Sequence, residues 1–261
     1  MTPRAPSTPR RGVRRGIYIL PALFTVGNVF CGYLSLDASL NKRFEVAALL
    51  VFLAAFLDGM DGRVARLTHT TSAFGEQLDS LADVVSFGVA PAFLVYRWAL
   101  VDFDRLGLLV SFLFVVCGAA RLARFNIQIH VVDKRYFVGL AIPAAAGTLC
   151  ALIWALPYPL PTIEAKALFL PVTALLAFLM VSTFRYRSFK DVDLKSRRSA
   201  VLVPLIALVL AAIAYKPAIA LSILLPLYAL SGPAAKALSL LPSAQAREAA
   251  RAKAAAQQTI G

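Results

Sequence analysis

The sequence predicts an all-α fold: a polytopic integral membrane protein built as a bundle of about eight transmembrane helices. Two observations lead to this fold class. Of the 261 residues, 59% are hydrophobic and 16% are charged, whereas soluble domains usually carry roughly 25% charged residues. Apolar runs long enough to cross a bilayer also recur along the chain. The net charge of +13 therefore indicates basic residues at the ends of membrane spans rather than a nucleic-acid partner.

The apolar runs divide the chain into eight segments. The last two are short and share a tight link at Lys216 and Pro217, so they could instead form a re-entrant pair or one kinked span. A proline-rich run over 157–161 predicts an external turn, because proline cannot continue a helix. The eight segments are 17–36, 45–66, 74–100, 106–126, 137–156, 167–184, 200–215 and 217–232.

The segments form one membrane domain over 16–233, between two polar tails. Residues 1–15 hold five arginines and no acid, and we expect this basic tail to lie unfolded against anionic lipid head groups or to act as a solvated anchor. Residues 234–261 are rich in alanine and predict a cytoplasmic tail. No internal repeat or soluble second domain is evident.

The distribution of basic residues predicts the orientation. With the N-terminus in the cytoplasm, 21 of the 27 Lys and Arg residues fall on the cytoplasmic side. This asymmetry favours an even number of spans with both termini cytoplasmic. The expected location is the cytoplasmic (inner) membrane, with multiple passes.

The stretch from Asp58 to Asp83 holds four carboxylates in otherwise apolar surroundings. Asp58 and Asp61 lie three residues apart, and Asp79 and Asp83 lie four apart, so each pair shares one face of a helix. Four uncompensated charges at mid-bilayer would cost roughly 10 kcal/mol on insertion scales. The orientation above places them toward the cytoplasmic half of the membrane. The sequence therefore predicts an acidic site that faces the cytoplasm and whose negative charge is balanced by other groups.

Bound divalent cations are the favoured compensation for these acids. Arg63 and Arg66 can pair with at most two of the four, and hard oxygen ligands select Mg²⁺, Mn²⁺ or Ca²⁺. Two metals held by shared carboxylates clamp phosphate oxygens. Arg66 can add a charged fork for a phosphate, and Gly62 lets a bulky ligand reach the backbone. The cluster therefore predicts metal-dependent phosphoryl-type transfer at a membrane surface, with intramembrane ion pairs as the alternative.

These residues resemble the complete signature of the CDP-alcohol phosphatidyltransferases, a family that transfers a phosphatidyl group from a CDP-linked lipid to an alcohol and releases CMP. The resemblance implies two divalent cations, Mg²⁺ or Mn²⁺, held by the four aspartates. It also implies that Asp83 takes the proton from the incoming hydroxyl, that Gly62, Arg66 and Ser72 hold the CDP-lipid, and that the protein is a homodimer. The eight matching positions are Asp58, Asp61, Gly62, Ala65, Arg66, Gly75, Asp79 and Asp83.

The surroundings of the cluster are similar to the phosphatidylserine synthase branch of that family, over roughly residues 17–230. Four stretches carry this likeness: 20–28, 79–91, 121–126 and 139–143. Ala141 departs from the proline expected there. The resemblance therefore implies CDP-diacylglycerol as donor and L-serine as acceptor.

Two further groups of polar residues are expected near the substrates. Thr25 and Asn28 lie in an apolar first span, and we expect them to serve the nucleotide of the CDP-lipid because buried amides need partners. Arg121, Arg124 and Asn126 end the fourth span and could bind serine, since a zwitterionic amino acid needs a cation for its carboxylate. The two arginines could equally be positive-inside anchors.

Other functions remain open from the sequence. Another acceptor, such as glycerol 3-phosphate, inositol phosphate or choline, would keep the same chemistry. From a different class, the acids could form the pathway of a divalent-cation transporter, although they concentrate in two adjacent helices near one face. A membrane scaffold without activity is the third possibility.

Overall fold

The computed structural model describes residues 14–68, 73–128, 136–156, 158, 160–187 and 199–240. This part of the chain is almost wholly helical, as predicted. Two π-helical turns, Val84–Val89 and Tyr96–Leu100, flank α4, and a 3-10 turn, Val101–Phe103, precedes α5. The helices are α1 (Arg14–Leu40), α2 (Phe44–Thr68), α3 (Ala73–Asp83), α4 (Ala90–Val95), α5 (Asp104–Gln128), α6 (Ile142–Ala155), α7 (Ile163–Ala167), α8 (Phe169–Val181), α9 (Ser199–Tyr215) and α10 (Pro217–Leu240).

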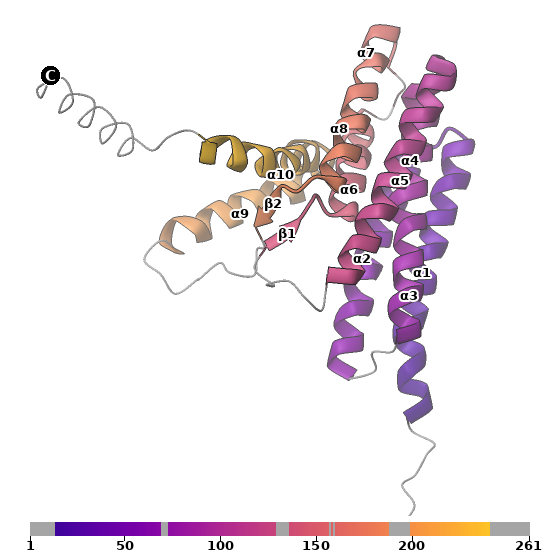
Figure 1. Ribbon diagram of the computed structural model, residues 1–261, viewed down its shortest axis with the longest axis vertical. Coiled ribbons are helices and arrows are strands. Elements are labelled where there is room, and N and C mark those ends of the chain that lie inside the picture. Colours follow the sequence, from indigo (N-terminus) through magenta and orange to yellow (C-terminus); the bar gives the residue numbers. More distant parts are fainter. Residues whose placement is uncertain are drawn as a thin grey trace, which may run out of the picture.

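Helices α1 to α6 and α8 stand side by side as one bundle (Figure 1). Small side chains allow the helices to approach: Ala47, Ala48 and Ala54 on α2 are completely buried. Such close packing of small residues is typical of membrane helices, where the hydrophobic effect does not drive association. The larger side chains of the core, such as Phe87 and Trp98, lie around α4.

Among the described residues, four helical stretches are long and apolar enough to cross a membrane: Ala22–Leu40, Phe74–Ile127, Ile163–Val181 and Pro217–Ala237. The second covers 54 residues and contains two of the predicted segments, because the chain turns back at Asp104, whose φ is 45°. α6 and part of α9 are apolar but shorter. The protein is thus a helical membrane protein, and the part of the chain that the structure describes has four candidate spans, so helix length and composition do not confirm the predicted count of eight.

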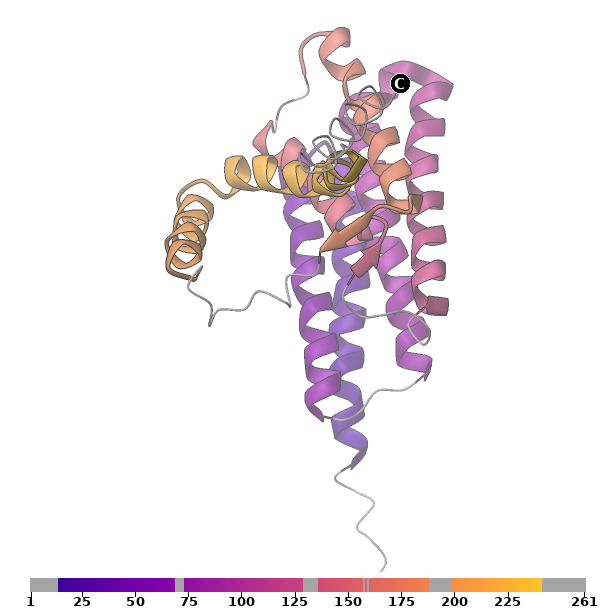
Figure 2. The same cartoon turned by 60° about the vertical axis from the view of Figure 1, so that its left-hand side comes forward.

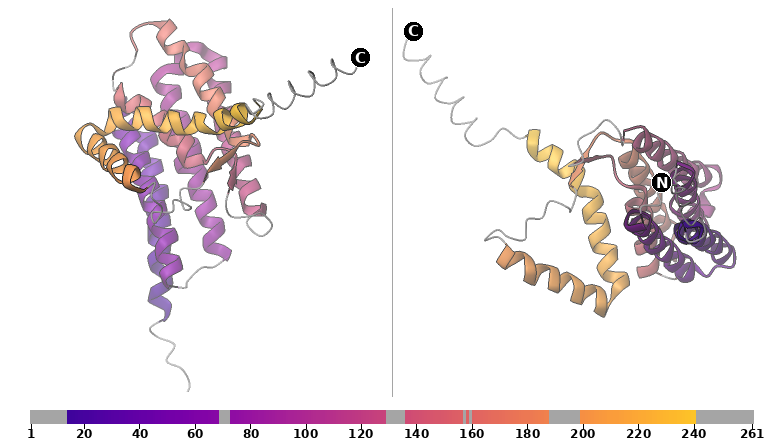
Figure 3. Two further views of the ribbon diagram at one scale, coloured as in Figure 1. Left: turned by 90° about the vertical axis from the view of Figure 1, so that its left-hand side faces the viewer. Right: turned by 90° about the horizontal axis from the view of Figure 1, so that it is seen from below.

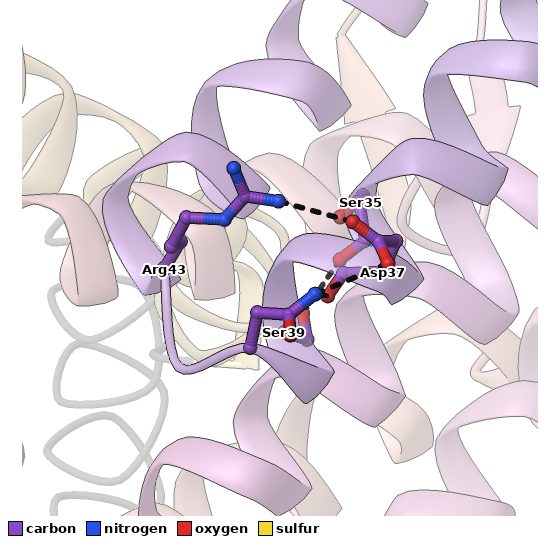
Figure 4. A network of polar contacts seen from close by, with 5 residues as sticks. Ser35, Asp37, Ser39 and Arg43 are labelled. Carbon is purple, nitrogen blue, oxygen red and sulfur yellow. Dashed lines mark hydrogen bonds and ion pairs between the residues drawn. The ribbon is translucent and has the colours of Figure 1, made fainter.

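A network of polar contacts holds the turn between α1 and α2 (Figure 4). Arg43 Nη2 donates to Asp37 Oδ2 at 3.0 Å, and Asn41 Nδ2 donates to the carbonyl and carboxylate oxygens of Asp37 at 2.9 and 3.1 Å. Ser35 Oγ donates to the Ala47 carbonyl at 2.9 Å and ties the two helices together. These contacts fix how α1 lies along α2.

A short antiparallel ladder interrupts the helical pattern. Strand β1 (Tyr136–Val138) pairs with β2 (Arg185–Arg187), with Phe137 opposite Tyr186. The predicted segment 137–156 therefore begins as a strand, and the residues that directly follow the predicted segment 167–184 form the partner strand. Gly139 explains the break: its φ is +78°, which a helix cannot continue, and its N–H donates to the Phe184 carbonyl at 2.9 Å.

Helices α9 and α10 run across the bundle rather than along it (Figures 1, 2 and 3). α10 packs on α6 and β2, and α9 packs on α10. α10 also continues to Leu240, through the predicted boundary between the membrane domain and the tail. The two last predicted segments are helices, but they do not align with the others.

Candidate active site

The four aspartates come from the end of α2 and from α3. Asp58, Asp61 and Asp79 each offer a carboxylate oxygen, and these atoms all lie within 4.8 Å of one another. Asp61 is buried, and Asp58 and Asp79 are half-buried. The helical spacing that paired the acids in sequence thus brings three of them to one point, where α2 faces α3.

Asp83 lies one helical turn beyond Asp79 and is not part of that group of three. It is buried, with 9% of its surface exposed, and it interacts electrostatically with Asp58 and Asp79. It sits at the junction of α3 with the first π-helical turn, where the Ala90 N–H reaches the Val85 carbonyl five residues back. π-helical turns of this kind occur often at functional sites.

Polar side chains of α1 contact the carboxylates of α2 and α3. Thr25 Oγ1 donates to Asp61 Oδ2 at 2.7 Å, and Asn28 Nδ2 lies 3.5 Å from Asp83 Oδ1. Ser86 Oγ donates to the Asn28 carbonyl at 2.9 Å. Thr25 and Asn28 were expected to face the nucleotide; the partners that the structure gives them are the carboxylates themselves.

The donor set fits divalent cations. Among the described residues, the ion pairs are Asp37 with Arg43 and Asp102 with Lys166, so none of the four clustered acids pairs with a described Lys or Arg. Buried oxygens without a hydrogen-bond partner also remain at the cluster, one on Asp79 and one on Asn28. Oxygen ligands of this kind are those that Mg²⁺ and Mn²⁺ prefer.

The predicted CDP-lipid residues are only partly described. Gly62 is half-buried in α2, one residue after Asp61. Arg66 belongs to α2, but its side chain lies outside the described residues, as does Ser72. Beside Thr25, a cavity of about 430 Å³ opens between α1 and α3. Its walls are almost entirely apolar and are formed by Thr25, Val26, Val29, Phe30, Tyr33 and Leu78.

The three predicted serine-binding residues have different surroundings. Arg121 is buried, interacts electrostatically with Asp83, and has an Nε atom without a partner in the described part of the chain. Arg124 Nη1 donates to the Val181 carbonyl at 2.9 Å and so joins α5 to the end of α8. Asn126 Nδ2 donates to Ser80 Oγ at 2.9 Å, between the two aspartates of α3. Of the three, Arg121 is the buried one, and it interacts with an acid of the cluster.

Sequence reasoning gave no role to two residues near this site. Ser86 supports the Asn28 backbone, and Tyr228 on α10 interacts electrostatically with Arg121. A hydroxyl in an apolar segment is the available signal for both, since a buried polar group needs a partner. That signal is weak, because serine and tyrosine also occur singly in many membrane helices.

The fold and the carboxylate cluster define a helical membrane protein with a candidate divalent-cation site. A sequence model of the CDP-alcohol phosphatidyltransferase family matches residues 18–183, and the chain belongs to this family. Enzymes of the family are metal-dependent, which agrees with the cluster of acids in α2 and α3.

The chain is also similar to named enzymes. It is 43% identical over 218 residues to a CDP-diacylglycerol–serine O-phosphatidyltransferase of Helicobacter pylori, covering 83% of this chain and 90% of that protein. The enzyme of that name in Bacillus subtilis is 36% identical over 171 residues, covering 66% and 91%. An archaetidylserine synthase of Methanothermobacter thermautotrophicus is 40% identical over 169 residues, covering 64% and 69%.

Proposed function

We propose that this protein transfers the phosphatidyl group of CDP-diacylglycerol to the hydroxyl of L-serine, giving phosphatidylserine and CMP. The observation that carries the proposal is the cluster of acids without a described cationic partner. It lies in a chain that resembles serine phosphatidyltransferases over most of its length. A cluster of this kind in a membrane protein requires a compensating charge, and bound cations supply it.

The four aspartates have separate roles in the proposed reaction. Asp58, Asp61, Asp79 and Asp83 hold two divalent cations, Mg²⁺ or Mn²⁺, which when bound would stabilise charge on the phosphate oxygens. Asp83 is in addition the general base, which is the role that the resemblance to the family implies for it, and it interacts electrostatically with Arg121. Thr25 orients Asp61 through its hydrogen bond.

The reaction is a direct displacement. As the serine hydroxyl oxygen forms its bond to the phosphatidyl phosphorus, its proton passes to Asp83 and the bond from phosphorus to the CMP oxygen breaks. The bonding electrons leave with CMP. No covalent enzyme intermediate is proposed, because no activated serine, cysteine or histidine accompanies the aspartates in the signature.

The donor and the acceptor are proposed to contact different residues of the site. Gly62, Arg66, Ser72, Thr25 and Asn28 are proposed to hold the CDP-lipid, and the unpartnered Asn28 oxygen offers an acceptor for the nucleotide. The apolar cavity beside Thr25 has walls suited to an acyl chain of that lipid. On the acceptor side, Arg121 binds the serine carboxylate, with Arg124 and Asn126 supporting the helix end around it.

We further propose that the protein crosses the cytoplasmic membrane eight times, with membrane lipids around the bundle. Both termini and the active site would face the cytoplasm, and the protein would be a homodimer. The basic residues support the orientation, since 21 of the 27 would then be cytoplasmic. Labelling of single cysteines in α9 and α10 from each side of sealed vesicles tests the last two spans, because these helices lie across the bundle.

The decisive assay follows CMP release by the purified protein with CDP-diacylglycerol and Mg²⁺ or Mn²⁺. CMP should be released when serine is supplied as the acceptor, and the lipid product should be phosphatidylserine. Faster release with glycerol 3-phosphate, inositol phosphate or choline would replace serine within the same chemistry. Cation flux into liposomes without any lipid product would instead indicate a transporter.

A further inference from the structure

Helix α1 and the π-helical turn that follows Asp83 approach each other closely at one glycine. A Cβ atom added to Gly32 would lie 2.6 Å from Ser86 Oγ and 3.0 Å from Ser86 Cα, so that either the serine or its backbone would have to move. Ser86 is completely buried. The absence of a side chain at Gly32 therefore allows Ser86 to pack directly on the backbone of α1.

Ser86 uses this space to bond to the backbone of Asn28. Its Oγ donates to the Asn28 carbonyl at 2.9 Å, an oxygen whose usual helical donor is the N–H of Gly32. Asn28 and Gly32 lie four residues apart on one face of α1. Asp83 and Ser86 lie three residues apart and share a face as well. The two faces meet twice: the serine hydroxyl packs on the glycine, and the Asn28 amide reaches the carboxylate.

The two ends of the Asn28 amide have different surroundings. Its Nδ2 lies 3.5 Å from Asp83 Oδ1, whereas its Oδ1 is buried without a hydrogen-bond partner in the part of the chain that the structure describes. Asn28 is completely buried, and an unpaired oxygen at such a position is costly unless a ligand donates to it. The nucleotide of CDP-diacylglycerol carries suitable donors, in its cytosine amino group and its ribose hydroxyls.

We propose that Ser86 and Gly32 are positioning residues for Asn28, and that the Asn28 amide joins the donor nucleotide to the general base Asp83. The inference rests on the proposed transfer from CDP-diacylglycerol to serine. With Nδ2 directed at Asp83 and Oδ1 at the nucleotide, one side chain orients both the base and the donor. Its direction depends on how α1 is rotated, and Ser86 fixes that rotation through the Asn28 carbonyl.

Steady-state kinetics with each substrate varied separately test this arrangement. Ser86→Ala should lower kcat about 10-fold through the loss of one supporting hydrogen bond. Gly32→Ala forces the two elements apart and should lower kcat about 100-fold, as a displacement of about 1 Å can. Both variants should raise the KM for CDP-diacylglycerol severalfold and leave the KM for serine unchanged.

A binding measurement without turnover complements the kinetics. Ser86→Ala should weaken the affinity for CMP, titrated calorimetrically in the presence of Mg²⁺, by the same factor as it raises the KM for CDP-diacylglycerol. A variant that only folded less well would lower kcat through the amount of folded enzyme. Its KM values and its affinity for CMP would stay those of the wild type, so these two quantities report on positioning rather than on stability.

The double variant Gly32→Ala/Ser86→Ala tests the contact itself. Removal of the hydroxyl also removes the atom nearest to the added Cβ, so the double variant should be more active than Gly32→Ala alone, whereas two independent defects would multiply. Gly88→Ala is the matched glycine control in the same turn, because a Cβ there would meet side-chain atoms only at 3.8 Å and beyond. Ser111→Ala is the serine control, since Ser111 is buried and its Oγ donates within α5.

The outcomes separate this inference from the proposed function. Unchanged CDP-diacylglycerol KM and CMP affinity in Ser86→Ala, or a double variant no better than Gly32→Ala, overturn the inference while the wild type still makes phosphatidylserine. A rise in the serine KM alone overturns it as well, because Asn28 would then face the acceptor. Absence of serine-dependent CMP release by the wild type overturns the proposed function, and the CMP titration still reports on Asn28 in that case. Ser86→Ala keeps the test valid where Gly32→Ala does not fold, because it removes a single atom.

Discussion

Acidic side chains at the two ends of the helical bundle have different partners. At the end where α1 turns into α2 and the chain turns back before α5, Asp37 pairs with Arg43 and Asp102 pairs with Lys166. Glu45, in the same region, accepts from Trp154 Nε1 at 3.3 Å. Every one of these acids has a protein donor.

Toward the other end, the acids of α2 and α3 lie close to one another instead. Asp58, Asp61 and Asp79 each have a carboxylate oxygen within 4.8 Å of the others, and among the described residues the side chains that donate to the cluster, Thr25 and Asn28, are neutral. Like charges brought together in a membrane are unfavourable unless a cation joins them. The comparison separates acids that pair with protein donors from acids for which we propose bound cations as partners.

The largest expected effect comes from removing one clustered charge. Asp79→Asn should lower kcat/KM by about 10³-fold, because a cation ligand contributes several kcal/mol to charge stabilisation in phosphoryl transfer. Asp37→Asn removes a similar charge at the other end and should leave kcat/KM unchanged. CMP release measured at saturating Mg²⁺ or Mn²⁺ checks both variants. Full activity of Asp79→Asn would show that Asp79 is not a ligand of a catalytic cation, whereas absence of CMP release from wild type and variant alike would favour the scaffold interpretation of the chain.

A smaller effect is expected from the neutral donors. Thr25→Val removes the hydroxyl that donates to Asp61 and should weaken the apparent metal affinity about 10- to 100-fold, as removal of an outer partner of a metal ligand commonly does. The measurement is activity as a function of Mn²⁺ concentration.

Two further variants sharpen this result. Thr25→Ser keeps the hydroxyl and should restore the metal dependence. Ser39→Ala removes a hydroxyl that donates to the Ser35 carbonyl at the other end and should not change it. A shift in the CDP-diacylglycerol KM alone, with unchanged metal dependence, would instead assign Thr25 to the nucleotide as the sequence suggested.

The sequence predicted the cluster more fully than its surroundings for a physical reason. Carboxylates in an apolar chain are conspicuous by residue type, and helical spacing within α2 and α3 places each pair locally. Thr25 and Asn28 lie more than thirty positions away from their partners along the chain. Which of several nearby polar groups they contact depends on how α1 packs, and spacing does not encode that.

The direction of α10 and the presence of the β ladder could not be predicted from the sequence, for a related reason. The apolar stretch Pro217–Ala237 is long enough to cross a bilayer, but length does not set tilt. Tilt follows from contacts such as Tyr186 with Ala229, which join residues 43 positions apart. Similarly, the apolar residues of β1 continue the hydrophobic pattern of α6, and only the positive φ of Gly139 separates them.

The smallest expected effect concerns the paired acids. Asp37 and Arg43 are exposed, with 52% and 58% of their side-chain surfaces accessible, and such pairs contribute about 0–1 kcal/mol. Arg43→Met should therefore lower the Tm in detergent by at most about 4 °C, with activity unchanged. The difference in Tm between the variant and the wild type should disappear at about 1 M salt, where charges at the surface are screened.

Lys42→Met is the matched control for this pair, because Lys42 is an exposed cation in the same turn and the ion pairs of the described residues do not include it. It should leave the Tm unchanged at any salt concentration. If Lys42→Met and Arg43→Met lowered the Tm equally, the net charge of this end, rather than the contact with Asp37, would be the stabilising factor. A loss of activity in Arg43→Met would go further: it would show that the turn between α1 and α2 controls how Thr25 meets Asp61, and that the two ends of the bundle are not independent.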